Sequence, residues 1–252
     1  MNRYVIIALL SLCSAPLFAQ SDLKESNFHL GVELQTKYVW RGVEQMEEEG
    51  APVVFPKLNY RYKGFTAYVS GGYAINGKFS EVDLGLSYTC NWLTLGLTDY
   101  YYPTTNSIED QYFNFKSRET GHCFEGYINV APDNIPAYLL FSCFFAGNDK
   151  NWDGKQAYST YGELGAHYDF IGGHQLGLAV GATFNKSYYN EYAHHFSVNN
   201  ITLKYTYNLM IKDFALPLSV AYIINPVVEK AHVNLTACRF LNDLFYLNSI
   251  LL

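Results

Sequence analysis

Apolar and polar residues alternate along residues 28–45, FHLGVELQTKYVWRGVEQ. Alternation with a period of two is the pattern of a β-strand, whose successive side chains point to opposite faces. One face is apolar and carries Phe28, Leu30, Val32, Leu34, Tyr38 and Trp40. The other face is polar and carries His29, Glu33, Gln35, Lys37 and Arg41. The pattern alone leaves open whether water or lipid covers the apolar face.

The same alternation recurs along the chain, with no convincing helix between the alternating segments. Most segments are long enough for the ~9–11 residues that a tilted strand needs to cross a bilayer. Strands of soluble domains usually have only about five or six residues. The eleven further segments are residues 53–62, 65–73, 80–90, 92–100, 123–130, 137–145, 158–169, 174–184, 196–207, 214–222 and 231–240.

The connections between these segments alternate between long and short, with one tie at the third connection. Barrels that enter the outer membrane from the periplasm have short periplasmic turns, long extracellular loops and an even number of strands. A soluble sandwich has no reason to follow this rule. We therefore predict an all-β protein, a transmembrane up-and-down antiparallel β-barrel of about 12 strands over residues 21–240, with its N-terminus in the periplasm.

The two ends of the chain differ from the barrel. Residues 1–20, MNRYVIIALLSLCSAPLFAQ, have a basic start, an apolar run and small residues at the end, as in a cleaved secretory signal peptide. No later run is long and apolar enough for a transmembrane helix. Phe240 supplies the aromatic residue expected at the end of a final strand. Residues 241–252 form an atypical apolar tail without clean alternation.

Composition supports an exported barrel and excludes other classes. Charged residues are 16% of the chain and aromatic residues 17%, with a formal net charge of −6. This charge and the lack of a basic cluster argue against nucleic acid as a partner. Cys90, Cys123, Cys143 and Cys238 have wide spacings and no CxxC pair, so we expect neither a zinc site nor a dense disulfide framework.

Four short motifs resemble the TorF-like porins, also called Gcw_chp, a family of conserved hypothetical bacterial outer-membrane proteins. They are TKYVWRGVEQ at 36–45, EVDLGLSY at 81–88, DYYYP at 99–103 and LPLSVAYIINP at 216–226. The resemblance spans most of the mature chain. It implies an outer-membrane barrel with a pore role, and it supplies no substrate and no catalytic residues.

The polar face of the strands predicts a lumen lined by charges of both signs. One interpretation is a narrow pore that selects a small polar or charged solute, and the alternative is a closed structural or adhesive barrel filled by salt bridges. We expect Tyr38, Trp40 and Trp92 in the aromatic girdles. The expected lumen residues are Glu33, Lys37, Arg41, Lys57, Arg61, Glu81, Asp83, Glu125, Glu163, His167 and Lys204.

Two segments stand out as functional candidates. Arg41 should point inward at the extracellular end of the first strand, where it would bind an anionic solute or tie the acidic loop EQMEEEG to the rim. The aromatic loop at 101–121 is a candidate for a surface binding element or a constriction that folds into the barrel.

Enzymatic activity is the competing class, because some twelve-stranded outer-membrane barrels hydrolyse lipids. Such a site needs a serine nucleophile and an oriented histidine. Candidates are His194 and His195 with Ser197, and His122 with Ser117 or Asp99, but no hydrolase signature surrounds them. We expect no enzyme, no cofactor and no metal, and as partners the outer-membrane lipids and lipopolysaccharide, the barrel-assembly machinery and a small solute.

Overall fold

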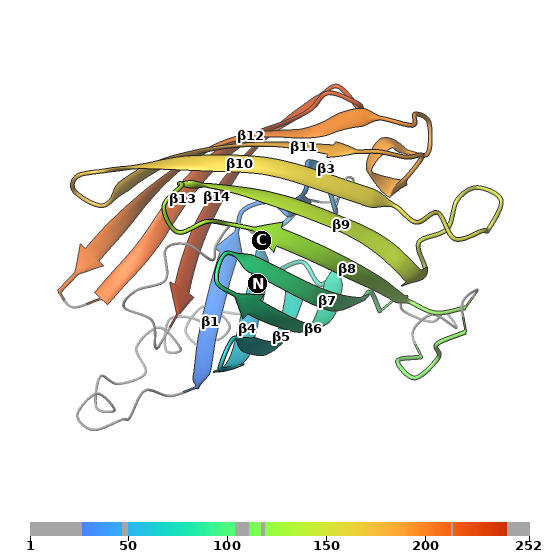
Figure 1. Ribbon diagram of the computed structural model, residues 1–252, viewed down its shortest axis with the longest axis horizontal. Coiled ribbons are helices and arrows are strands. Elements are labelled where there is room, and N and C mark those ends of the chain that lie inside the picture. Colours follow the sequence, from blue (N-terminus) through green and yellow to red (C-terminus); the bar gives the residue numbers. More distant parts are fainter. Residues whose placement is uncertain (1–26, 47–49, 104–110, 117–118, 213, 241–252) are drawn as a thin grey trace.

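The computed structural model describes residues 27–46, 50–103, 111–116, 119–212 and 214–240. Twelve strands form one closed antiparallel barrel (Figure 1). The barrel strands are β1 (Phe28–Gln35), β4 (Val53–Tyr62), β5 (Phe65–Ala74), β6 (Ser80–Cys90), β7 (Leu93–Tyr101), β8 (His122–Val130), β9 (Ala137–Gly147), β10 (Thr160–Phe170), β11 (His174–Thr183), β12 (Ser197–Ile211), β13 (Phe214–Asn225) and β14 (Lys230–Phe240). The remaining elements are a two-stranded hairpin, β2 (Val39–Trp40) and β3 (Val43–Glu44), and the 3₁₀ turn η3 (Tyr188–Asn190).

The barrel closes where its first and last strands meet. β1 pairs with β4 on one side and with β14 on the other, from Gly31 opposite Phe240 to Gln35 opposite Thr236. Every other barrel strand pairs with its neighbours in the sequence, as an up-and-down topology requires. Closure leaves the sheet without an edge, so the backbone groups of the wall are paired within the protein. The predicted fold class is confirmed.

The two ends of the barrel differ. One end of the barrel holds the start of β1 and the turn at 63–64 between β4 and β5, and we call it the turn end. We call the opposite end the loop end. At the turn end the connections include residues 63–64, 91–92, 131–136 and 171–173. At the loop end four connections are long, namely 36–52, 102–121, 148–159 and 184–196, and two are short, 75–79 and 226–229.

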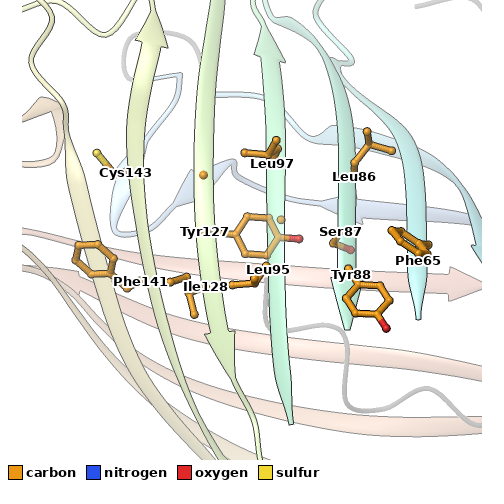
Figure 2. Close-up of a pocket in the computed structure, with 12 residues that line it drawn as sticks. Phe65, Leu86, Ser87, Tyr88, Leu95, Leu97, Tyr127, Ile128, Phe141 and Cys143 are labelled. Carbon is orange, nitrogen blue, oxygen red and sulfur yellow. The ribbon is translucent and has the colours of Figure 1, made fainter. Parts of the chain in front are cut away.

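The outer wall is apolar and the inner wall polar. On β12, Leu203 and Tyr205 are exposed on the outside, whereas Lys204 and Thr206, which alternate with them, lie on the inner face. A groove of about 560 Å³ crosses the outer wall and is lined mainly by apolar side chains such as Leu95 and Ile128 (Figure 2). So much exposed apolar surface is unfavourable in water, and the wall fits the hydrocarbon of a bilayer.

No helix within the described ranges is long and apolar enough to cross a membrane.

Inside the barrel, tyrosine rings cover glycines on neighbouring strands. Tyr68 lies over Gly85, where a Cβ atom would come within 2.0 Å of the ring. Tyr127 covers Gly96 in the same way. Because glycine has no side chain, the rings lie flat against the wall, and their hydroxyl groups reach other polar groups in the lumen. The same arrangement joins Tyr138 with Gly165 and Tyr161 with Gly181.

The structure changes one strand boundary in a way that matters for function. The strand expected over 28–45 ends at Gln35, and the chain then leaves the wall. The expected signal peptide at 1–20 and the tail at 241–252 lie outside the described residues. The cysteines are free where described, with no disulfide among Cys90, Cys123, Cys143 and Cys238.

The assignment of faces predicts opposite responses to a charge at adjacent positions on β12. Leu203→Lys places an ammonium group toward lipid near the middle of the strand, so we expect the free energy of unfolding to fall by about 2–4 kcal/mol. Thr202→Lys places the same group in the polar lumen and should lower it far less. Urea unfolding in lipid vesicles measures both, and equal losses would contradict the assignment.

Candidate functional site: a hairpin inside the lumen

Residues 38–45 form a small hairpin that we call the lumen hairpin. Its strands β2 and β3 pair Val39 with Glu44 and Trp40 with Val43. The two turn residues, Arg41 and Gly42, both have positive φ angles, 50° and 78°. A two-residue turn with two positive φ angles is the tight hairpin turn that favours glycine. The sequence WRGV therefore reverses the chain at the point where the first strand was expected to continue.

Arg41 fixes the tip of the lumen hairpin to the far wall. Its guanidinium forms a two-pronged ion pair with Glu125 on β8, at 2.5 and 3.1 Å, and donates a third hydrogen bond to the Tyr189 hydroxyl at 2.7 Å. The Arg41 side chain is 12% exposed and that of Glu125 only 1%. Tyr100 also donates to Glu125, at 3.0 Å. The carboxylate is thus held by three donor groups, which compensates its burial.

Aromatic rings enclose this ion pair. The Arg41 guanidinium lies 4.4 Å from the ring centre of Trp40 and 4.7 Å from that of Tyr161. The Trp40 ring in turn contacts Tyr100 and Tyr189, at centroid distances of 5.5 and 5.7 Å. These contacts exclude water from the ion pair and strengthen it.

The backbone of the tip is also bound to the wall. The Arg41 carbonyl accepts a hydrogen bond from the Asn199 side chain at 2.7 Å, and the Gly42 carbonyl accepts one from Asn225 at 3.0 Å. A Cβ atom on Gly42 would lie 2.0 Å from the Asn199 carbonyl oxygen. The close approach and the positive φ angle both require glycine at this position.

The base of the lumen hairpin has its own charged contacts. Glu44 pairs with Lys37 at 2.6 Å and lies 3.7 Å from His232 on β14. At the other side of the base, the Tyr38 ring packs on Phe55, and its hydroxyl donates to Glu81 at 3.4 Å. The lumen hairpin therefore contacts the wall on several sides and narrows the lumen at the loop end.

Two expected positions are corrected by this geometry. Tyr38 and Trp40 do not lie in the outer aromatic girdle, because the chain turns inward after Gln35 and carries both rings into the lumen. Arg41 does point inward, and it pairs with Glu125 on β8. Residues 47–49 of the acidic loop lie outside the described residues, so a contact between Arg41 and that loop stays a prediction. Trp92 is 52% exposed at the turn between β6 and β7, and its place in a girdle stays a prediction.

Glu163 forms a second buried polar network near the lumen hairpin. Its carboxylate accepts hydrogen bonds from the hydroxyl groups of Tyr138 and Tyr161 and from the Asn200 amide, which lies 2.9 Å away. Glu81 and Asp83 face the lumen on β6, where Ser70 donates to Asp83 at 3.0 Å. Among the described residues, these three carboxylates accept hydrogen bonds from the neutral donors Tyr138, Tyr161, Asn200, Tyr38 and Ser70.

The turn-end half of the lumen carries the other expected charges. Lys57, Arg61 and Lys204 lie on inward positions of β4 and β12 and are partly exposed. Glu33 also faces inward and accepts a hydrogen bond from Gln35. His167 lies 3.6 Å from Asp169. This half of the lumen is lined by polar and charged side chains of intermediate exposure.

Residues 111–116 of the aromatic loop at 101–121 do not build the constriction, whereas Tyr102 at its start packs on Phe79, which contacts Tyr38. Residues 111–116 pack on the outer wall, where Tyr112 and Phe115 contact the His122 ring. Phe113 is 85% exposed there. The constriction comes from the first long connection, which contains the lumen hairpin.

The hydrolase candidates do not form a reactive dyad among the described residues. His122 lies on the outer wall, with Nδ1 2.9 Å from the Asp99 carboxylate and Nε2 2.7 Å from the Tyr112 carbonyl. Both ring nitrogens face acceptors, so neither is available as a base. Ser197 is buried and accepts from Asn190, whereas His195 is exposed. Ser117 lies outside the described residues.

Metal ligation finds no support in the described part of the chain, where no group of three His, Cys, Asp or Glu side chains is placed to hold an ion. Asp149 is occupied by Ser159 and Gln156 in its own loop.

Sequence reasoning missed the residues that receive the lumen hairpin. Tyr189, Asn199 and Asn225 come from connections and strand ends at the loop end, and nothing in their local sequence pairs them with residues 41–42. The hairpin itself had a signal, because a glycine directly after a polar residue between apolar residues is typical of a two-residue turn.

Together these features define a class: a closed antiparallel barrel with an apolar outer wall, a polar lumen and an internal constriction built by its first long connection. No protein-family model matches the chain, and no curated protein matches it.

Several solved structures show distant likeness. A chain from the structure described as "Unveiling the Mechanism Behind the in-meso Crystallization of Membrane Proteins" is 9% identical, with a TM-score of 0.49 over 84% of this chain and 82% of that chain. A "Bacterial polysaccharide outer membrane secretin" is 9% identical, with a TM-score of 0.37 over 87% and 98%. OccAB3 of Acinetobacter baumannii is 11% identical, with a TM-score of 0.39 over 85% and 64%. The barrel assignment rests on the strand pairing and outer wall of this chain itself.

The buried ion pair predicts strong coupling between its two members. Arg41→Met leaves the Glu125 carboxylate buried without its cation, and Glu125→Leu leaves the guanidinium without its carboxylate. Each should lower the free energy of unfolding by about 3–5 kcal/mol. The double variant Arg41→Met/Glu125→Leu should recover most of the loss. Urea unfolding of the four proteins gives the coupling energy, and additive losses would contradict the pairing.

Proposed function

We propose that the protein is an outer-membrane channel for small polar or charged solutes, closed down at its loop end by the lumen hairpin. The single observation that carries this proposal is the division of the lumen. Its turn-end half is polar and partly exposed, with Lys57, Arg61 and Lys204 on its wall. Its loop-end half is narrowed by residues 38–45.

A channel role explains why charges occupy the lumen. A barrel that served only as a scaffold would be stabilised by fully paired or apolar residues inside. Here both lysines lack a salt bridge among the described residues, whereas the charges around the lumen hairpin are paired. The polar, water-accessible wall is suited to solute passage, and the paired region is suited to restricting it.

Opening requires the tip of the lumen hairpin to leave the far wall. The hairpin is attached covalently only at its base, and Arg41 holds the tip through Glu125 and Tyr189. Glu125 lies on the wall strand β8, and Tyr189 lies on η3 in the connection 184–196. Movement of this one segment would widen the lumen without breaking the barrel.

A closed structural or adhesive barrel is the second candidate. The observation that favours it is the dense packing at the loop end, where Tyr161 and Tyr189 are almost completely buried around the tip. Enzymatic activity is not part of the proposal, because both nitrogens of His122 face acceptors, and His195 is exposed whereas Ser197 is buried.

The apolar wall supports a place in the outer membrane, with lipid and lipopolysaccharide around it and the barrel-assembly machinery as its insertion partner. Closed barrels are the form in which a sheet can span a bilayer. The short turns would face the periplasm, together with the chain ends, and the long connections would face outward.

Conductance in a planar bilayer tests the channel. The wild-type barrel should give small conductance steps, and Arg41→Ala/Glu125→Gln should increase the mean conductance several-fold, because only the backbone hydrogen bonds from Asn199 and Asn225 still hold the tip. Arg239→Gln is the matched control, since this arginine lies over Phe214 on the outer side of the wall, 4.1 Å from the ring centre. If folded wild type and the double variant both give no channel events, the closed barrel is the correct interpretation.

A further inference from the structure

Two lysines in the turn-end half of the lumen have no anionic partner in contact. Lys57 on β4 and Lys204 on β12 both face inward and are half-buried. Across the described residues neither has a carboxylate within salt-bridge distance, and Lys57 Nζ lies instead 4.7 Å from the centre of the Tyr68 ring. An ammonium group that is removed from bulk water without a partner is costly.

The two lysines serve the same part of the lumen. Both lie near enough to Glu33 for an electrostatic interaction with its carboxylate. Glu33 lies directly opposite Cys238 in the pairing of β1 with β14. Lys57 lies opposite Gly31, two positions before Glu33. The side chains of Lys57 and Lys204 therefore both lie near Glu33.

The local charge balance is positive. Arg61 adds a third cation on β4, and it interacts with Lys57. Glu33 is the carboxylate shared by both lysines, and its oxygen accepts a hydrogen bond from Gln35. Asp83 also interacts with Lys57, and one of its carboxylate oxygens accepts a hydrogen bond from Ser70 at 3.0 Å.

From this geometry we propose that Lys57 and Lys204 form a binding site for a small oxyanion, such as inorganic phosphate, in the turn-end half of the lumen. The inference rests on the proposed channel, because it names the class of solute that the channel takes. Each ammonium group offers three N–H donors on a flexible stem, so the pair can hold an anion from two sides. A bound oxyanion supplies the partner that both ammonium groups lack.

Arg41 is not part of this site. Its guanidinium is already held by Glu125 and Tyr189 and enclosed by Trp40. An anion bound by the two lysines would therefore lie on the turn-end side of the lumen hairpin. Opening of the hairpin would then connect this site with the outside.

Binding of inorganic phosphate to the folded barrel in a zwitterionic detergent tests the site directly, without a membrane. Titration calorimetry at low ionic strength avoids screening by salt. The wild-type barrel should bind phosphate, and Lys57→Gln/Lys204→Gln should bind it about tenfold more weakly or worse, because two charge-assisted contacts are lost. Glu33→Gln should bind it more tightly, because a repelling carboxylate is removed.

The matched control is Lys63→Gln/Lys212→Gln, which removes the same charge from two exposed turns. It should bind phosphate like the wild type. Lys204→Arg keeps the charge and should retain binding, which separates a lost site from a misfolded barrel, and heat-modifiable gel migration checks folding of each protein. No phosphate binding by the wild type, or equal binding by the two double variants, would overturn the site.

The channel and the site can fail separately. Conductance without phosphate binding would leave the channel standing and reject the oxyanion. Binding without conductance would reject the channel and leave an anion site inside a closed barrel. In a conducting barrel the reversal potential under a potassium chloride gradient should favour chloride, and the Lys57→Gln/Lys204→Gln variant should reduce this preference.

Discussion

Every backbone N–H and C=O of the wall has to find its partner within the protein, because hydrocarbon offers none. The pairing of β1 with β14 meets this requirement by removing the two edges that the sheet would otherwise have. The alternation of each strand then sends apolar side chains outward and polar side chains inward. The interior of this protein is therefore polar by necessity, which reverses the arrangement of a soluble domain.

The buried polar groups of such an interior need hydrogen-bond or charge partners, and the chain supplies them in two ways. Tyrosine rings lie over glycines and direct their hydroxyl groups to carboxylates, as Tyr138 does toward Glu163. The lumen hairpin brings the Arg41 cation to Glu125 at the loop end. Among the described residues, no carboxylate forms a salt bridge with Lys57 or Lys204 in the turn-end half, and Lys57 contacts the Tyr68 ring instead. The difference between the paired half and the unpaired half supports both the constriction and the anion site.

Much of the fold could be predicted from the sequence, because alternation and loop lengths are local properties of a chain. The inward positions of Glu33, Lys57 and Lys204 follow directly from strand parity. The prediction that Tyr38 and Trp40 face lipid is wrong because the alternation of the sequence continues after the strand has ended. Only the turn at Arg41 and Gly42 indicates that the chain reverses its direction there. The partners of that turn could not be predicted, since Glu125, Asn199 and Asn225 are brought to it by closure of the barrel.

The position of Trp40 tests the central claim most directly. In a protein where Trp92 and Trp152 are replaced by phenylalanine, Trp40 is the remaining tryptophan. Inside the lumen, its fluorescence should be insensitive to brominated lipids, whereas a protein that keeps only Trp92 serves as the comparison at the exposed end of the barrel. Strong quenching of Trp40 by brominated lipids would place it in the girdle and contradict the lumen hairpin.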